Sequence, residues 1–150
     1  MVVSWLRSAD EVYAWAGLRS YPPRPDLFVQ WHRDPEVHPF LLVRAGSEEP
    51  MAYGEIWEDR DENEAELARL VVDPACRGQG VGQRLVLGLV GEAQGLGFQD
   101  IWLRVLSSHH VAQACYRASG FVRATPIQEA QFNQMQPTVY AWIRVVNLQR

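Results

Sequence analysis

The sequence predicts a single α/β domain, residues 1–150, built on a mixed β-sheet. The chain has 150 residues and 47% of them are hydrophobic, which is enough for one domain with a sizeable core. An apolar segment at 67–72, a glycine-rich loop and a helical pattern at 81–94 precede a second apolar segment at 101–106. A strand–helix–strand unit of this length makes a right-handed crossover and pairs its two strands in parallel. Upstream, apolar segments separated by short turns predict an antiparallel meander.

The N-terminal segment predicts a short strand at 2–6 followed by a helix. Ser8 and Glu11 have the spacing of a capping box, so the helix is expected at 9–16, and Gly17 ends it. Apolar residues recur in this segment at helical spacing, which places one face of the helix on the core.

A second short helix is expected at 27–32, after a proline-rich stretch at 21–25 that cannot continue a helix. Asp26 is placed to cap this helix. Two interpretations are open for Trp31 on the helix and Tyr21 before it. Both side chains pack in the core, or both border a binding pocket.

Three antiparallel strands follow at 39–45, 51–57 and 65–72, and a hairpin at 46–50 joins the first two. The turn before the third strand is acidic, and in this turn and its flanks Arg60 is the single basic residue. Such a run is either a solvated loop or an acidic rim that draws a cationic amine by electrostatic steering. The acidic residues are Glu55, Glu58, Asp59, Asp61, Glu62, Glu64 and Glu66.

The C-terminal part predicts another helix and the last two strands of the sheet. Ser107 or Ser108 is expected to cap the helix, which a glycine then ends. Strands are expected at 121–125 and 138–146. The polar segment between them, 126–136, is expected to be a loop that folds over the binding site.

The stretch Arg77-Gly78-Gln79-Gly80-Val81-Gly82, here called the glycine loop, carries the strongest functional signal. Its glycines permit a tight turn and a close backbone approach to a ligand. The N–H groups at the start of the following helix lack intrahelical partners and carry the positive end of the helix dipole, which suits a diphosphate. Arg77 is expected to add a positive charge at the rim. The other interpretation is a plain turn and helix cap.

Two other anion-binding loops fit this stretch poorly. A Walker A loop ends in Gly-Lys-Ser/Thr, whereas Gly82 is followed by Gln83 and Arg84. A dinucleotide-binding Gly-x-Gly-x-x-Gly loop needs a glycine where Gln83 stands. The sequence therefore excludes the first loop type and disfavours the second.

Composition and charge exclude several other classes of protein. The net charge of −4 argues against a nucleic-acid-binding protein. No apolar run approaches the roughly 20 residues that span a bilayer. The N-terminus lacks the basic and apolar regions of a signal peptide. Cys76 and Cys115 have no metal-binding spacing and fit a reducing cytoplasm.

Two motifs resemble those of the GNAT superfamily of N-acyltransferases. The glycine loop is similar to its coenzyme A loop, Arg/Gln-x-x-Gly-x-Gly/Ala, with Arg77, Gly80 and Gly82 in the matching positions between a strand and a helix. The helix after the second strand resembles the second signature, Asn-x-x-Ala-x-x-x-Tyr-x-x-x-Gly-Phe, with a histidine in the asparagine position. Together the two motifs cover residues 65–121. The residues aligned with the second signature are His109, Ala112, Tyr116, Gly120 and Phe121.

The resemblance implies a GNAT fold, a mixed sheet of six or seven strands with about four helices. Two parallel strands splay apart in this fold and admit the pantetheine arm of coenzyme A. The resemblance further implies acetyl-CoA as the cofactor, held by the backbone N–H groups of Leu70 and Val72 at the thioester and of residues 79–82 at the diphosphate. The cofactor-binding residues that it implies are Leu70, Val71, Val72, Arg77, Gly78, Gln79, Gly80, Val81, Gly82, His109 and Ala112.

An acceptor pocket for a primary amine of a small molecule or a peptide is also implied. In the family, the segment joining the first two helices lines this pocket, which favours that role for Tyr21 and Trp31. Glu55, in the acidic stretch, is a third candidate for contact with a cationic acceptor.

The resemblance implies direct attack of the amine on the thioester, with Tyr116 as the general acid toward sulfur. A lysine-like amine of pKa about 10.4 is almost entirely protonated at pH 7, so a base is needed. Glu66 is the best candidate for this base. By strand alternation it shares a face with Ala68, Leu70 and Val72 unless a bulge intervenes.

Alternatives stay open at this point. Tyr116 is also explained as a core tyrosine and Glu66 as a solvated carboxylate, and Glu55 and His109 are reserve bases. Family asparagines in the position of His109 contact the pantetheine arm, so this histidine either replaces that donor or is a plain helix-start residue. Nothing activates Cys115 as a nucleophile. A coenzyme A-binding domain with weak or no turnover, O-acylation, a longer acyl donor and a homodimer through the last strand are also compatible with the sequence.

Overall fold

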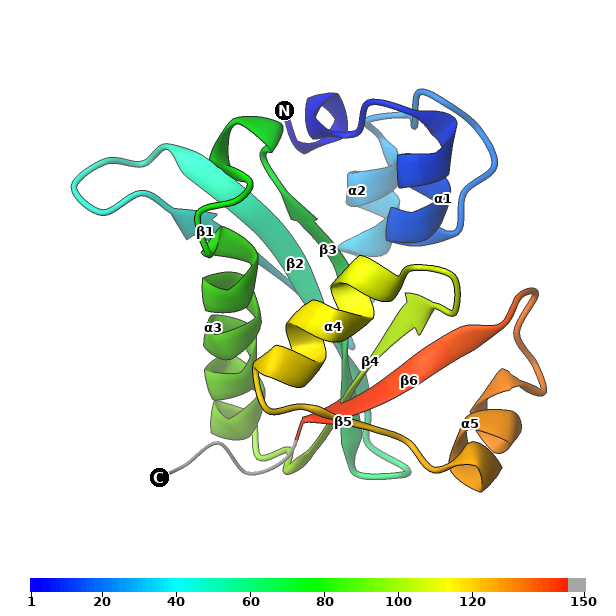
Figure 1. Cartoon of the computed structure of the whole chain (residues 1–150). Helices are drawn as coiled ribbons and strands as arrows, with labels where there is room; N and C mark the ends of the chain where they lie inside the picture. The colour runs from blue at the N-terminus through cyan, green and yellow to red at the C-terminus, as the bar shows by residue number, and fades with distance from the viewer. Residues whose placement is uncertain (146–150) are drawn as a thin grey trace.

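The computed structural model describes residues 1–145, in which α-helices surround one β-sheet (Figure 1). Among these residues, every helix is too short or too polar to span a bilayer. In chain order the elements are the 3-10 helix η1 (Val2–Trp5), α1 (Ala9–Ala16), α2 (Leu27–Trp31), β1 (Val37–Val43), β2 (Pro50–Asp59), β3 (Glu64–Val72), the 3-10 helix η2 (Pro74–Cys76), α3 (Val81–Gly95), β4 (Asp100–Leu106), α4 (His110–Ala118), β5 (Val122–Arg123), α5 (Pro126–Asn133) and β6 (Tyr140–Val145).

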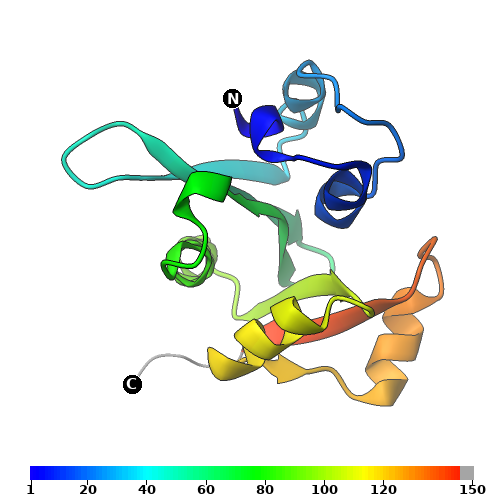
Figure 2. The ribbon, with the colours of Figure 1, turned by 45° about the horizontal axis from the view of Figure 1, so that its top comes forward.

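The strands form one six-stranded sheet in the order β1-β2-β3-β4-β6-β5. β3 and β4 are parallel, as the crossover through α3 predicts, and all other neighbours are antiparallel. One core cluster packs α3 and part of α4 on one face of the sheet. Two further clusters pack α1, α2 and α5 on the other face. The sheet therefore lies between two layers of helices (Figures 1 and 2).

Local sequence signals set the ends of the helices that flank the site. The Ser8 hydroxyl accepts a hydrogen bond from the Glu11 amide at 3.1 Å at the start of α1, and Gly17, with φ 69°, ends it. α3 begins after Gly80 and turns an apolar face to the sheet. The buried residues of α3 are Val81, Leu85, Val86, Leu89, Val90 and Ala93.

A β-bulge interrupts the pairing of β2 with β3. Tyr53 pairs with Val71 and Glu55 pairs with Ala68, so two residues of β3 face one residue of β2. An extra residue in one strand bends that strand and shifts the faces to which its side chains point. The bulge therefore decides which residues of β3 lie beside the site.

The alternation of side chains along β3 reverses at the bulge. Ala68 stays on the face of Glu66, whereas Leu70 and Val72 pack against the core under α3 on the other face. The shared face was expected only if no bulge intervened. Because one does, it holds for Glu66 and Ala68 and not for Leu70 and Val72. Gly54 lies opposite the bulge, and a Cβ there would lie 2.7 Å from Leu70 Cδ2, so this close approach requires glycine.

β3 and β4 pair only at their N-terminal ends. Four register pairs join them, the last being Leu67 with Leu103. Beyond this pair β3 follows β2 to Val72, while β4 follows β6 to Leu106, and the two strands diverge (Figure 2). The bulge, at Arg69 and Leu70, comes two residues after the last residue of β3 that pairs with β4, so it bends this strand away from β4. The splayed parallel pair implied by the resemblance is confirmed.

Residues 2–6 do not form the expected first strand. They include η1, and Trp5 and Leu6 pack with Trp15 in the core between α1 and the sheet. A segment of five mostly apolar residues is compatible with any buried element, so its pattern does not distinguish a strand from a helical turn. The sheet consequently has six strands in the described residues.

Residues 126–136 are mostly helical, so the expectation of a loop there is wrong. Thr125 and Gln128 form a reciprocal capping box at the start of α5, and Pro126 occupies its first turn. These start signals outweigh the polar composition of the segment. β5, Val122–Arg123, is much shorter than the expected strand.

Two expected caps are not made by the side chains named. Asp26 stands at the N-cap of α2, but its side chain makes no capping bond. α4 has His109 at its N-cap instead of Ser107 or Ser108, because β4 continues to Leu106 and the chain needs the next residues to turn. The last residue of the expected final strand lies outside the described residues.

Candidate active site

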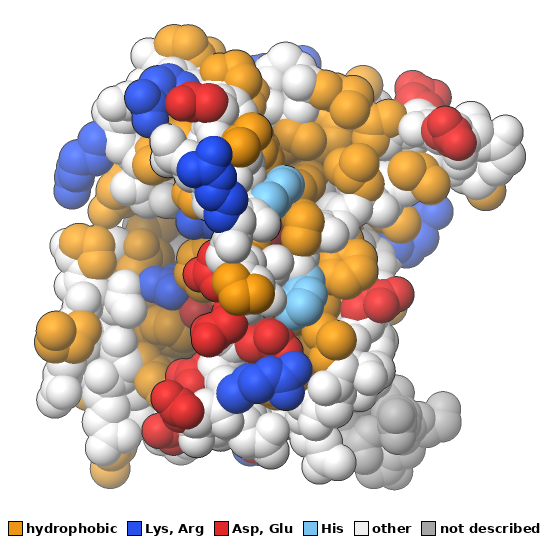
Figure 3. All heavy atoms as spheres, turned by 180° about the vertical axis from the view of Figure 1, so that it is seen from behind, with side chains coloured by type: hydrophobic (Ala, Val, Ile, Leu, Met, Phe, Trp, Pro, Cys, Tyr) orange, Lys and Arg blue, Asp and Glu red, His pale blue; other side chains and the backbone are white. Residues whose placement is uncertain are grey.

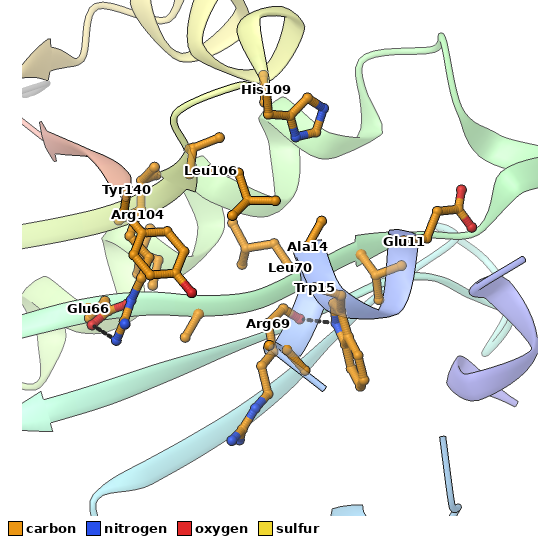
Figure 4. Close-up of a pocket in the computed structure, with 18 of the residues that line it drawn as sticks. Glu11, Ala14, Trp15, Glu66, Arg69, Leu70, Arg104, Leu106, His109 and Tyr140 are labelled. Carbon is orange, nitrogen blue, oxygen red and sulfur yellow. Dashed lines mark hydrogen bonds and ion pairs between the residues drawn. The ribbon is translucent and has the colours of Figure 1, made fainter. Parts of the chain in front are cut away.

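A cavity of about 560 Å³ opens where β3 and β4 diverge, between α1 and α4 (Figure 4). It is bounded by two parallel strands and two helices that are distant in the sequence. The expected site residues that line it are Glu66, Leu70, Val71, Val72, Arg77, His109, Ala112 and Tyr116. The tertiary structure therefore brings the main predicted residues to one place.

The glycine loop adjoins this cavity through Arg77 and leads directly into α3. Gly78 and Gly80 both have φ 76°, a left-handed conformation that favours glycine, and a Cβ at either position would meet nothing within 4 Å. No side chain caps the first turn of α3. Its leading N–H groups are therefore available to an anion, and the loop leaves open space beside them.

Arg77 is tied to α1 and does not stand free at the rim. Its NH1 lies 3.2 Å from Glu11 Oε1, and its Nε donates to the Val72 carbonyl at 3.3 Å. The pKa of Glu11 is lowered, first by the hydrogen bond from the Arg7 backbone N–H and then by Arg77. Arg77 therefore also fixes α1 against the end of β3.

Tyr116 reaches the cavity from α4 with its ring against the core. The ring stacks on Phe121 at 6.2 Å between centroids, the pair that closes the second motif. Burial raises the pKa of the Tyr116 phenol to about 12. At neutral pH the phenol therefore holds its proton, as a general acid must.

The start of α4 is fixed by a glutamine that the sequence analysis missed. Gln113 is buried, and its Nε2 donates to the carbonyls of Leu106 at 3.2 Å and Ser107 at 3.0 Å. His109, at the N-cap, is exposed and lines the cavity. A lone polar residue on the inner face of an amphipathic helix was the only signal for Gln113.

Glu66 enters the cavity wall in a bidentate ion pair with Arg104 of β4. The Glu66 carboxylate lies 2.7 Å from Arg104 Nε and 3.0 Å from its NH2. Burial raises the pKa of Glu66 against the opposing effect of Arg104. The pair joins the parallel strands near the point where they part, and Figure 4 shows it beside Tyr140.

Arg104 and Tyr140 were not predicted as site residues. Arg104 NH1 also donates to Gln136 Oε1 at 2.8 Å, so the segment after α5 reaches the cavity wall. The Arg104 guanidinium lies 5.3 Å from the ring centroid of Tyr140 and 5.0 Å from that of Trp142. One charged residue inside the apolar strand at 101–106 was the available signal for Arg104.

Glu55 does not belong to an exposed acidic rim. Its side chain is 0% exposed and accepts hydrogen bonds from Tyr53 Oη, from Trp57 Nε1 at 2.8 Å and from Arg69 NH1 at 2.8 Å. It is not among the residues that line the cavity. The proposed contact of Glu55 with an acceptor and its role as a reserve base therefore have no geometric support.

A second cavity of about 390 Å³ lies beside α2 and shares Trp57 and Arg69 with the first. Trp31 lines it, together with three acidic residues. These are Asp34 and Glu36 from the α2–β1 connection and Glu58 from β2. Figure 3 shows acidic side chains gathered on one face of the molecule. Tyr21 is 48% exposed and lines neither cavity, so the structure separates the two proposed acceptor contacts.

Comparisons with known proteins agree with this geometry. The family model described as Acetyltransferase (GNAT) family matches residues 2–121. One relative, the ribosomal protein bS18-alanine N-acetyltransferase of Haemophilus ducreyi, is 38% identical to this chain over 63 residues. This match covers 42% of the chain and 43% of the relative, so the chain spans less than half the length of that relative.

Solved structures share the fold at low sequence identity. An acetyltransferase of the GNAT family from Staphylococcus aureus Mu50 aligns over 99% of this chain and 91% of its own, with TM-score 0.66 and 16% identity. A protein from Bacillus anthracis described as a streptothricin acetyltransferase, solved with acetyl coenzyme A, aligns over 80% of this chain and 68% of its own, with TM-score 0.61 and 17% identity. Because the family model spans most of the chain and includes both motifs and the splayed strands, the protein belongs to the GNAT family of acetyltransferases.

Proposed function

We propose that the protein transfers an acetyl group from acetyl-CoA to a primary amine of a small molecule or a peptide, by direct attack of the amine. The observation that carries the proposal is the cavity between the diverging ends of β3 and β4. Tyr116 lines this cavity, and the uncapped start of α3 follows Arg77, which also lines it. A relative that matches 42% of the chain is named as an N-acetyltransferase of an alanine of ribosomal protein bS18, which supports an amine as the acceptor class.

The residues present fit acetyl-CoA. Residues 79–82 offer uncapped backbone N–H groups and open space for a diphosphate. The backbone of Leu70 and Val72 lies at the unpaired edge of β3, where N–H groups would hold the pantetheine amide and the thioester oxygen. His109 and Ala112 border the same cavity. The bound thioester supplies an acetyl group activated toward attack by an amine.

Tyr116 and Glu66 divide the proton transfers in this proposal. Tyr116 protonates the departing sulfur, which its pKa of about 12 permits throughout the neutral range. Glu66 removes a proton from the amine, directly or through a water molecule, and Arg104 holds its carboxylate in place. The free thiols Cys76 and Cys115 suit a reducing cytoplasm.

A thiol-release assay with acetyl-CoA tests the proposal. The panel contains a peptide with an N-terminal alanine, a polyamine, a lysine side-chain amine and an alcohol. We expect amine-dependent release of coenzyme A, with mass spectrometry showing one acetyl group on the amine. Turnover on the alcohol alone would contradict amine transfer.

The second candidate function is a coenzyme A-binding domain without turnover. His109 in place of the family asparagine favours it, because the matching donor to the pantetheine arm is changed. Thermal stabilisation by acetyl-CoA with no thiol release on any amine would support this candidate and contradict the first.

Replacing Glu66 by glutamine is expected to lower kcat/KM for the amine by about 100-fold at pH 8, because a general base contributes roughly 10²- to 10⁴-fold. The pKa of Glu66 is raised, so its ionised form is lost as pH falls through a value above 4.5. The ratio of wild-type to variant rates should therefore shrink toward one at acid pH, and taking the ratio cancels the ionisation of the amine itself.

Glu64→Gln is the matched control for this prediction. Glu64 lies on the same strand two residues earlier and is not among the residues that line the cavity. We expect its rates to stay within about threefold of wild type, as for surface changes away from the chemistry. A pH-independent ratio for Glu66→Gln would remove the base assignment.

A further inference from the structure

Arg69, in the bulge of β3, holds a backbone conformation that arginine rarely adopts. Its φ is 51°, and Asn63, with φ 55°, is the only other non-glycine residue with a positive φ in residues 1–145. Asparagine tolerates this region, whereas an arginine there is strained. Such strain persists only where the surrounding structure imposes it, and it gathers at functional sites.

Three elements hold Arg69 at both its backbone and its side chain. Trp15 Nε1 of α1 donates to the Arg69 carbonyl at 2.8 Å (Figure 4). The guanidinium carbon of Arg69 lies 3.5 Å from the ring centroid of Trp31 on α2 and 4.7 Å from that of Trp57 on β2. Its NH1 donates to Glu55 Oε1 at 2.8 Å. We call Glu55, Arg69, Trp31 and Trp57 the Arg69 clamp.

In this clamp, Glu55 and Arg69 each depend on the other for a charged partner. The carboxylate is fully buried, and Tyr53 Oη, itself 3.0 Å from His32 Nε2, donates to its other oxygen. A buried carboxylate without its cation is strongly unfavourable, and so is a guanidinium without its carboxylate. Glu55 therefore holds the Arg69 side chain across the strand, and the strained backbone follows from that side-chain position.

We propose that Arg69 is a positioning residue for the acetyl-CoA cavity, and that the Arg69 clamp maintains the bulge which parts β3 from β4. The bulge begins at Arg69, two residues after Leu67, the last residue of β3 that pairs with β4. Leu70, in the bulge, lines the cavity. The identity of the ligand rests on the proposed function, but the holding of the gap does not.

The test compares alanine with glycine at position 69. Arg69→Ala removes the clamp and keeps a Cβ, so the residue relaxes toward an extended conformation and the gap narrows. We expect coenzyme A, measured by titration calorimetry, to bind about tenfold more weakly to this variant. Arg69→Gly also removes the clamp, but glycine adopts a positive φ without strain, so affinity should return to within about threefold of wild type.

Two further variants separate positioning from general loss of stability. Glu55→Gln leaves the guanidinium without its carboxylate and should weaken coenzyme A binding as Arg69→Ala does, while the double variant Glu55→Gln/Arg69→Gly should bind like Arg69→Gly alone. Asn63→Ala is the matched control. It places alanine at a similar φ in the turn directly before β3, and should lower the melting temperature without changing affinity.

Hydrogen exchange of the amides at 68–72 gives a readout that needs no ligand. Closure of the gap in Arg69→Ala would pair this edge of β3 and slow exchange, whereas Arg69→Gly should exchange as wild type does. If wild type fails to bind coenzyme A, the proposed function is lost, and hydrogen exchange still decides the role of the clamp. Equal exchange and equal affinity for the alanine and glycine variants would overturn the positioning role. If Arg69→Ala does not fold, Glu55→Gln against the double variant makes the same comparison.

Discussion

Replacing Tyr116 by phenylalanine should lower kcat by about 100- to 1,000-fold while the dissociation constant of acetyl-CoA stays within about threefold of wild type. The substitution removes one hydroxyl and keeps the ring, so the stacking on Phe121 and the packing of α4 on the core persist. What is lost is the proton for the departing sulfur. Steady-state rates by thiol release and affinity by calorimetry separate the two effects.

The pH dependence of wild type adds a second check on Tyr116. Because burial raises the pKa of this phenol from 10 to about 12, it keeps its proton as pH rises from 7 to 10. Activity should therefore show no loss from ionisation of Tyr116 in that interval. Tyr140 also lines the cavity, so Tyr140→Phe is the competing variant. A larger loss of kcat for Tyr140→Phe than for Tyr116→Phe would transfer the acid role to Tyr140.

Placing tryptophan at Gly80 should abolish measurable binding of acetyl-CoA. We expect the affinity to fall by about 100-fold or more, because backbone strain and steric blocking both weaken binding and each loss of about 1.4 kcal/mol in binding free energy lowers the affinity tenfold. The position has φ 76°, which a tryptophan adopts only under strain. Its side chain would also enter the open space beside the uncapped start of α3, where we place the diphosphate.

Gly46→Trp is the control for strain alone. Gly46 has φ 78° in the hairpin between β1 and β2, and a Cβ there also meets nothing within 4 Å. Both variants should lose similar amounts of thermal stability, but only Gly80→Trp should lose the ligand. Equal affinities in the two variants would place the diphosphate elsewhere.

Much of the fold could be predicted from the sequence because most of the patterns that specify it lie within single elements or their connections. Ser8 and Glu11 mark the start of α1, the apolar spacing after Gly80 marks α3, and the crossover length makes β3 and β4 parallel. The errors fell where signals were short or in conflict. The apolar pattern of the N-terminus fits both a strand and the helical turn that forms there, and the polar composition of 126–136 favours a loop although a capping box starts α5.

The candidate site was predicted in its backbone parts better than in its charged parts. Arg77 of the glycine loop and Tyr116, both singled out by the motifs, line one cavity. Glu66 lines the cavity, but its partner Arg104 is 38 residues away in the sequence. The acidic stretch, which the sequence leaves open between a solvated loop and an acidic rim, contains Glu55, which is buried and bonded to Arg69.

The sequence by itself determined the tight turn at the glycine loop and the helix that follows it, because both depend on backbone preferences within a few residues. It also determined the parallel crossover, because a strand–helix–strand connection of this length takes one hand. Only the tertiary structure decided which face of β3 each side chain occupies, since one extra residue at the bulge reverses the alternation beyond it. That reversal sets Leu70 and Val72 against α3, and the bulge puts Arg69 between two tryptophans. Pairings of this kind depend on register across strands, which no local pattern encodes.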